Sequence, residues 1–428
     1  MLDLFNSSSA PLATTLIFAL ALSANLLLKF WLAGRQISHV ARHRSAVPVT
    51  FSDKISLVAH HKAADYTIAK TRFGMIELAW GAALAVCWTL LGGLSALNEL
   101  LFGLMGHGLS QQVALIAAFF AIGGLLDLPF TLYQTFVIEE FFGFNKTTWK
   151  LWLQDFAKSL LLSAVIGLPF ITLVIWMMGA IGPLWWLWVW GAWMGFNLAA
   201  LLIYPTWIAP LFNKFKPLED PQVKERVTAL MARCGFTSKG FFVMDGSKRS
   251  AHANAYFTGF GASKRVVFYD TLLAQLTPQE VDAVLAHELG HFKHRHVIKR
   301  IVSMFAMSLV GFFALGWISQ QPWFFTGLGV LPNLGGANDA LALLLFMMVF
   351  PLFGTFVGPV FARTSRKHEF EADAFAVTHS SGEALASALL KLFEDNASTV
   401  TPDPVYVAFY YSHPPATERL GRIMAASS

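Results

Sequence analysis

The sequence predicts a mainly α-helical integral membrane protein that also carries a smaller polar α+β unit. Hydrophobic residues make up 55% of the 428-residue chain and charged residues only 13%, with 39 Phe and 14 Trp. This composition lies well beyond that of a soluble globular protein. Apolar stretches of about 20 residues, the length that crosses a bilayer as a helix, recur along the chain. Two polar blocks interrupt or follow these stretches, and they are long enough to fold outside the lipid.

Seven stretches have the length and apolar character of membrane spans. The fourth and fifth are separated only by Gly182 and Pro183, which predict a tight turn. The first has no basic residue before it, so we interpret it as an uncleaved anchor and not as a signal peptide. The predicted spans cover residues 14–31, 78–97, 113–133, 160–181, 184–203, 301–318 and 341–361.

The basic residues predict the orientation of the spans. All 31 Lys and Arg residues lie on one side of the seven-span arrangement or at span ends that face it. None precedes Lys29, and the loops after spans two, four and six carry only Glu99 and Asp339 as charges. Because cations are retained in cytoplasmic loops, we expect the N-terminus outside and the C-terminus in the cytoplasm. We attribute the net charge of +5 to these retained basic loops, and we infer no nucleic-acid partner from it.

The spans divide the chain into four segments: 1–209 with spans one to five, a polar block 210–300, spans six and seven in 301–362, and a second polar block 363–428. Both polar blocks fall on the cytoplasmic side, and we expect them to fold together. In the first, the short apolar runs 240–244, 254–258 and 265–269 predict strands, and 276–300 predicts a helix. The two cysteines lie in segments too different to form a disulfide.

The predicted helix 276–300 carries the sequence HELGH. Thr277 can cap this helix, with Pro278 in its first turn and Glu280 completing a capping box. His287 and His291 are four residues apart, so they share a helix face and can bind one Zn²⁺. Two imidazoles leave coordination positions open for a third protein ligand and a water.

Glu288 lies beside the two histidines and is placed to accept a proton from that water. The motif therefore predicts metal-assisted hydrolysis, although HExxH also arises by chance. A third histidine ten residues after the first is excluded, because position 297 is Val.

The third ligand is expected from SRKHEFEADAFA at 365–376, just after the seventh span. If this stretch is helical, Glu369 can reach the metal while Asp373, four residues later, orients a ligand histidine. The alternative is a helix end with solvated charges. We interpret His294 and His296 as part of a solvated basic helix end. His413, in SHPP, has a backbone restrained by two prolines, and its own sequence context leaves its role open.

These residues together resemble the type-one CAAX prenyl endopeptidases, the a-factor-converting kind of membrane zinc protease. The resemblance runs over nearly the whole chain. Its motifs are FVIEEFFGFNKTT at 136–148, YPTWIAPLFNKFKPLED at 204–220, DGSKRSAHANAYFTG at 245–259, VLAHELGHFK at 284–293, SRKHEFEADAFA at 365–376 and YSHPP at 411–415.

The resemblance implies a zincin-like catalytic unit with one Zn²⁺ per chain and seven spans around a water-filled chamber. It assigns the residues as follows: zinc ligands His287, His291 and Glu369, general base Glu288, oxyanion stabiliser His413, supporting residue Asp373, and substrate-binding residues Asn254 and Ala255 on an edge strand. A turn residue is the alternative for Asn254. The implied partners are membrane lipid and a peptide or protein substrate, lipidated in this family.

The implied reaction is removal of the last three residues from a CAAX C-terminus, in the inner membrane of a bacterium or the endoplasmic reticulum of a eukaryote. Three alternatives stay open. A related quality-control protease would use the same chemistry on misfolded membrane proteins. A transporter or lipid-handling chamber would use the metal structurally, but such sites are closed by four protein ligands. An intramembrane-cleaving protease would place HExxH in an apolar span, whereas charged residues bracket it here: Glu280, Asp282, Lys293, Arg295, Lys299 and Arg300.

Overall fold

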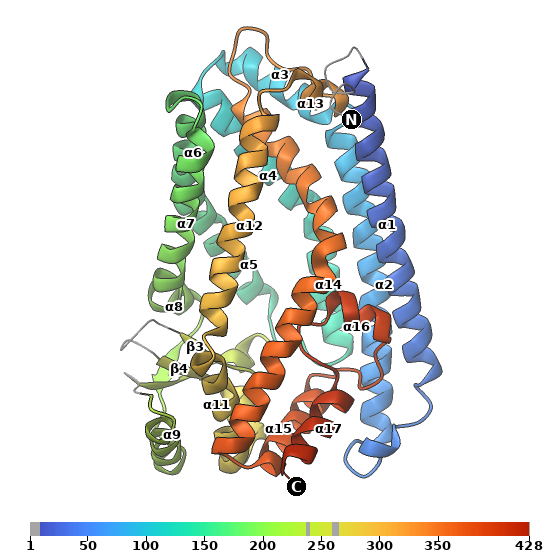
Figure 1. Ribbon diagram of the computed structural model, residues 1–428, viewed down its shortest axis with the longest axis vertical. Helices are drawn as coiled ribbons and strands as arrows, with labels where there is room; N and C mark the ends of the chain where they lie inside the picture. The colour runs from blue at the N-terminus through green and yellow to red at the C-terminus, as the bar shows by residue number, and fades with distance from the viewer. Residues whose placement is uncertain (1–8, 237–239, 259–264, 428) are drawn as a thin grey trace.

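The computed structural model describes residues 9–427 except 237–239 and 259–264. Within these residues, six helical stretches are long and apolar enough to cross a membrane, and a bent helix pair brings the number to seven. The N-terminus and the C-terminus lie at opposite ends of the molecule, as an odd number of spans requires (Figure 1). The six are α1 (Ala10–Arg42), α4 with its π-helical extension (Leu109–Glu139), α5 to α6 (Trp149–Ala180), α7 to α8 (Trp185–Phe212), α12 (His296–Ile318) and α14 (Asp339–His379).

The bent pair corrects the second predicted span. Helix α2 (Leu57–Trp88) and helix α3 (Gly93–Met105) meet at an angle of 51°, so the continuous helix expected over 78–97 does not form. Gly92 adopts a φ of 80° at the break, a left-handed conformation that favours glycine. Helix α2 lies beside α1, and α3 crosses the upper end of the molecule (Figure 1). The first part of α2 is polar, so its helix could not be recognised from hydrophobicity.

The tight turn predicted between spans four and five is present. Helix α6 (Leu168–Ala180) ends before Gly182, which has a φ of 85°, and α7 (Trp185–Ile203) then runs back. Span four itself is a composite of α5 (Trp149–Leu162), a π-helical turn (Ser163–Gly167) and α6.

A four-stranded sheet lies at the lower end of the molecule (Figure 1). Its order is β1-β2-β4-β3, with β2 (Phe241–Met244) and β4 (Arg265–Tyr269) parallel and the outer pairs antiparallel. The three predicted strands are confirmed, including β3 (Ala255–Thr258) at one edge. The prediction missed β1 (Phe215–Pro217), a short edge strand whose Lys and Pro are poor strand signals.

One hydrophobic core joins the two polar blocks. Phe268 of β4 and Leu285 of α11 (Pro278–Lys293) are buried in the same cluster as Leu385 and Leu420 from the C-terminal block. The helices that complete this unit are α9 (Pro221–Arg233), α10 (Asp270–Gln275), α15 (Gly382–Asp395), α16 (Pro404–Tyr410) and α17 (Ala416–Ser427). Residues from both polar blocks therefore fold as one body.

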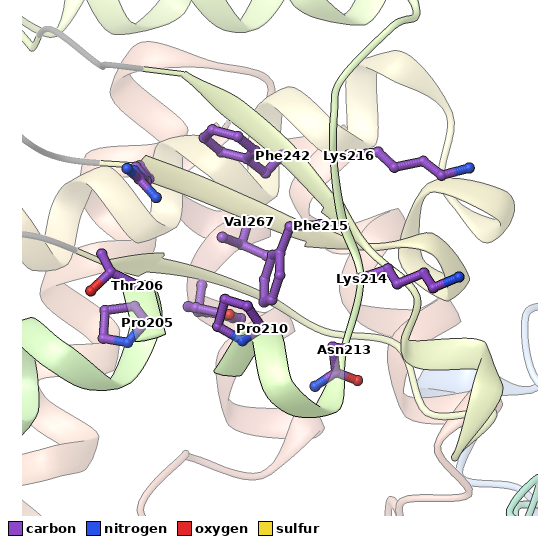
Figure 2. Close-up of a pocket in the computed structure, with 11 residues that line it drawn as sticks. Pro205, Thr206, Pro210, Asn213, Lys214, Phe215, Lys216, Phe242 and Val267 are labelled. Carbon is purple, nitrogen blue, oxygen red and sulfur yellow. The ribbon is translucent and has the colours of Figure 1, made fainter. Parts of the chain in front are cut away.

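The other face of the sheet is hollowed. A cavity of about 420 Å³ lies between the sheet and the end of the fifth span. Its lining residues, among them Pro205, Pro210, Phe242 and Val267, are drawn in Figure 2. Lys216 lies at its rim. None of the predicted metal ligands lines this cavity.

The helix expected over 276–300 is two helices. Helix α11 ends at Lys293, Arg295 adopts a left-handed conformation with φ 57° and ψ 34°, and α12 begins at His296. A left-handed non-glycine residue costs about 1–2 kcal/mol, and no glycine marks the position, so the sequence does not predict the break. The break turns the chain from the sheet unit into the sixth span.

Candidate metal centre and active site

The helix that carries HELGH is anchored at its start by the predicted capping box. The Thr277 hydroxyl accepts a hydrogen bond from the Glu280 amide at 3.4 Å, and the Glu280 carboxylate accepts one from the Thr277 amide at 2.7 Å. Lys391 of α15 also donates to Glu280, at 2.7 Å. The capping box therefore fixes the start of α11 and ties the helix to α15.

Gly290 of HELGH allows the closest approach between α11 and α14. A Cβ atom at this position would lie 2.9 Å from the Ala372 Cα and 3.1 Å from the Ala372 carbonyl oxygen. Both contacts are with backbone, which cannot move aside as a flexible side chain can. The absence of a side chain at Gly290 therefore lets α14 come close enough to present Glu369 to the two histidines.

Helix α14 continues without a break from the seventh span into the sheet-containing unit, so the helical condition placed on SRKHEFEADAFA is met. Glu369 is only 4% exposed. Its carboxylate oxygens lie 3.5 Å from His287 Nε2 and 3.4 Å from His291 Nε2, and these two nitrogens are 3.2 Å apart. The three predicted ligands therefore converge, with one ligand atom from each within 4.8 Å of the others.

The chemistry of this cluster fits a metal ion. Two imidazole nitrogens and a carboxylate are a donor set that zinc takes in catalytic sites. Glu369 Oε2 is buried and has no hydrogen-bond partner among the described residues, which is costly for a polar atom without a cation.

The pKa values of the two histidines are consistent with a cation in the cluster. Burial and the positive neighbour His287 lower the pKa of His291 to about 3, so its ring is neutral, as a ligand must be. Burial opposes a charge on His287, but the adjacent carboxylates of Asp373 and Glu369 raise its pKa to about 9 overall. A bound metal ion would displace the second ring proton of His287, because an imidazole that binds a metal must be neutral.

Asp373, the predicted supporting residue, lies against the first histidine. Its carboxylate lies 2.9 Å from His287 Nδ1, so the Nδ1 carries the ring proton and the Nε2 lone pair faces the cluster. Arg419 of α17 in turn donates from Nε to Asp373 at 2.9 Å and is only 5% exposed. Sequence reasoning missed Arg419, because a single arginine on an amphipathic helix has no distinguishing signal.

The second histidine has a partner that sequence reasoning also missed. His291 Nδ1 lies 3.0 Å from His296 Nδ1, and His296 Nε2 lies 2.8 Å from a Glu371 carboxylate oxygen. The prediction of a solvated His296 is therefore wrong, since this residue is 1% exposed. The cause is the left-handed turn at Arg295, which brings the first residue of α12 back against the end of α11. His294 is exposed, as predicted.

Two further groups flank the cluster. Glu288 follows His287 and is half-buried, and burial raises the pKa of its carboxyl above the ordinary value. His413 Nε2 lies 3.5 Å from Glu369 Oε1, while its Nδ1 is 3.0 Å from the Ser412 hydroxyl. The His413 side chain is 64% exposed, and partial desolvation lowers the pKa of its ring.

The predicted substrate edge lies beside this cluster. Ala255 begins β3, which has no second neighbour among the described strands, and Asn254 immediately precedes it. The Asn254 carbonyl accepts a hydrogen bond from the Tyr269 amide at 3.0 Å, which holds the start of the strand in place. Asn254 and His413 line one cavity of about 900 Å³.

Membrane-spanning helices joined to a His, His, Glu cluster with an adjacent carboxylate define a membrane metallopeptidase. Comparisons with known families agree. A family model described as CAAX prenyl protease N-terminal, five membrane helices, matches residues 36–214, and one described as peptidase family M48 matches residues 217–427. The chain belongs to peptidase family M48.

Its relatives include the CAAX prenyl protease 1 homolog of Oryza sativa subsp. japonica, 37% identical over 78% of this chain and 76% of that protein. CAAX prenyl protease 1 of Saccharomyces cerevisiae is 33% identical over 87% of each chain. The crystal structure of S. mikatae Ste24p superposes with a TM-score of 0.89 at 31% identity, covering 96% of this chain and 99% of that one. This match confirms the predicted fold class of membrane helices around a chamber with a metallopeptidase unit.

Proposed function

We propose that this protein is a zinc-dependent membrane endopeptidase that processes the C-termini of CAAX-type substrates. The observation that carries the proposal is the convergence of His287, His291 and Glu369 beside Glu288. A donor set of three residues leaves coordination open, which distinguishes a catalytic zinc from a structural one. The substrate class is supported by the printed names of the relatives, which are CAAX prenyl proteases.

The reaction follows from the roles of four side chains. Zinc, when bound, polarises the scissile carbonyl and makes water a better nucleophile. Glu288 accepts the proton of the attacking water and delivers it to the leaving amine, for which a raised pKa is suited. Asp373 and Arg419 hold His287 in the ligating tautomer. With the Ser412 hydroxyl donating to Nδ1, His413 carries its proton on Nε2, and this N–H donates a hydrogen bond to the oxyanion.

The substrate is held as an added strand on β3, against Asn254 and Ala255. Main-chain hydrogen bonds at a sheet edge recognise an extended conformation more than a sequence. This mode of binding favours flexible or membrane-associated chains. It also supports a second candidate function, quality control of misfolded membrane proteins, in which the same site would cut unrelated unfolded segments.

A three-substrate comparison tests the proposal. The purified protein should cleave a farnesylated CAAX peptide, and we expect its unmodified twin to be cut more slowly. A zinc chelator should abolish both reactions, and added zinc should restore them. Equal cleavage of an unrelated unfolded segment would favour the quality-control function. If none of the three peptides were cleaved, the proposed peptidase function would be contradicted. The alternative of a transporter with a structural metal would then be favoured.

We also infer an outside N-terminus and a cytoplasmic C-terminus, because Lys and Arg are confined to one side of the spans. Reporter fusions at each end should give opposite signals. The position of the two ends in Figure 1 supports an odd number of spans. Reporters on the same side would remove one span, and the orientation of the catalytic unit would then have to be reassigned.

A further inference from the structure

The cavity of about 900 Å³ beside the metal cluster extends well beyond the reacting groups. It begins at Asn254 and His413 and continues to Tyr66 and Lys70 on helix α2. Its volume lies in the range of cavities that bind small ligands, about 300–1,000 Å³. No carboxylate is among its lining residues in the described part of the chain. The lining mixes aliphatic and aromatic side chains with hydroxyl, amide and cationic groups, and the cationic groups suit an anion.

Only two of the lining residues carry a permanent positive charge. Arg419 is committed, because its guanidinium binds both oxygens of the buried Asp373. Lys70 is the other, and its side chain is 42% exposed. Lys70 is therefore the cation that the cavity offers to a ligand.

A hydrogen-bond network holds Lys70 in place without using all of its donors. Its Nζ lies 3.0 Å from the Tyr66 hydroxyl and 3.4 Å from a Glu139 carboxylate oxygen. The Tyr66 hydroxyl donates to the same carboxylate at 2.7 Å. An ammonium group has three N–H donors, so one remains after these two contacts. Glu139 thus orients the ammonium group and leaves a donor for the cavity.

The direction of the edge strand β3 determines which end of a bound peptide points toward Lys70. Strand β3 starts at Ala255, and the residues just before it, His252 to Asn254, line the cavity. A peptide paired antiparallel with β3 enters the cavity with its carboxyl end. Three residues of extended chain span about 10 Å at 3.3–3.6 Å each. The terminal carboxylate of a CAAX peptide then lies inside the cavity, past the bond that is cut.

We propose that Lys70 binds the terminal carboxylate of the substrate and thereby selects chains that end three residues beyond the scissile bond. The proposal rests on the proposed peptidase function and adds to it a specificity-determining residue. A charged hydrogen bond at this position favours a free C-terminus over a blocked one or a continuing chain. Binding of the terminal carboxylate would therefore place the cut at a fixed, short distance from the end of the chain.

The test compares two CAAX peptides that differ only in a terminal carboxylate or carboxamide. In the full-length zinc-loaded protein, kcat/KM should be about 10-fold to 100-fold higher for the acid, the range of one hydrogen bond to a charged group. In Lys70→Gln this ratio should fall close to one, mainly through KM. Lys70→Arg should recover part of it. An unchanged ratio in a zinc-replete Lys70→Gln protein would overturn the proposal.

Two controls keep the outcome unambiguous. Lys216→Gln removes an exposed lysine at the rim of the separate cavity in Figure 2, and should leave the acid-to-amide ratio unchanged. Inhibition of the wild-type protein by the tripeptide product, as acid and as amide, tests the same contact without relying on Lys70→Gln folding. Equal inhibition by both forms would contradict the proposal. Cleavage of both peptides with no preference refutes the role of Lys70 alone, whereas cleavage of neither refutes the peptidase function.

Discussion

Replacing Glu288 with Gln should reduce turnover by about 10²-fold to 10⁴-fold while leaving one zinc per chain. The magnitude is that of general acid–base catalysis. The amide keeps the size of the side chain but cannot accept the proton, and the three ligands His287, His291 and Glu369 remain. Metal content and peptidase rate should be measured on the same preparation.

The pH dependence of the wild-type protein gives a second measurement of the same role. Because burial raises the pKa of Glu288, the residue becomes protonated at a pH above the ordinary carboxyl range. Since the base must be ionised, kcat/KM should fall as the pH drops through this raised pKa. The exposed Glu383 on α15 offers a matched substitution, and Glu383→Gln should retain full activity. Zinc loss in Glu288→Gln that parallels the loss of activity would contradict the role of base.

Replacing Glu369 with Ala should remove most of the bound zinc, whereas Asp373→Ala should weaken binding by about 10-fold to 100-fold. The first change deletes a ligand atom from the cluster. The second leaves all three ligands but removes the acceptor that orients His287 at 2.9 Å, and outer partners of metal ligands contribute in that range. Competition with a zinc chelator of known affinity measures both.

Two other results would bear on this assignment. Stoichiometric zinc with normal affinity in Glu369→Ala would show that a residue other than Glu369 is the third ligand. His296→Ala should behave like Asp373→Ala, because His296 holds the other ligand histidine at 3.0 Å. Asp373→Ala also leaves Arg419 buried without its carboxylate, so thermal unfolding should be recorded with each zinc titration to separate local from global effects.

Much of the catalytic site was predictable because its signals are local. His287 and His291 share a face through the period of one helix, and Thr277 with Glu280 marks where that helix begins. The same spacing made Glu369 and Asp373 candidates on a second helix, and the family resemblance assigned their roles. These relations extend over a few residues, so they survive in any fold that keeps the helices. What spacing could not show is that the two helices meet, which depends on the bare backbone at Gly290.

The sequence by itself determined the membrane class, the HELGH helix, the three longer strands and the candidate ligands, because hydrophobic length, period and capping act within one segment. Only the tertiary structure decided that Arg419 supports Asp373, that His296 supports His291 and that Lys70 faces the active-site cavity. Arg419 lies 46 residues from Asp373, and Tyr66 beside Lys70 lies 73 residues from Glu139. Such pairs form because packing and helix breaks, such as the one at Arg295, bring distant segments together, and no local pattern encodes that approach.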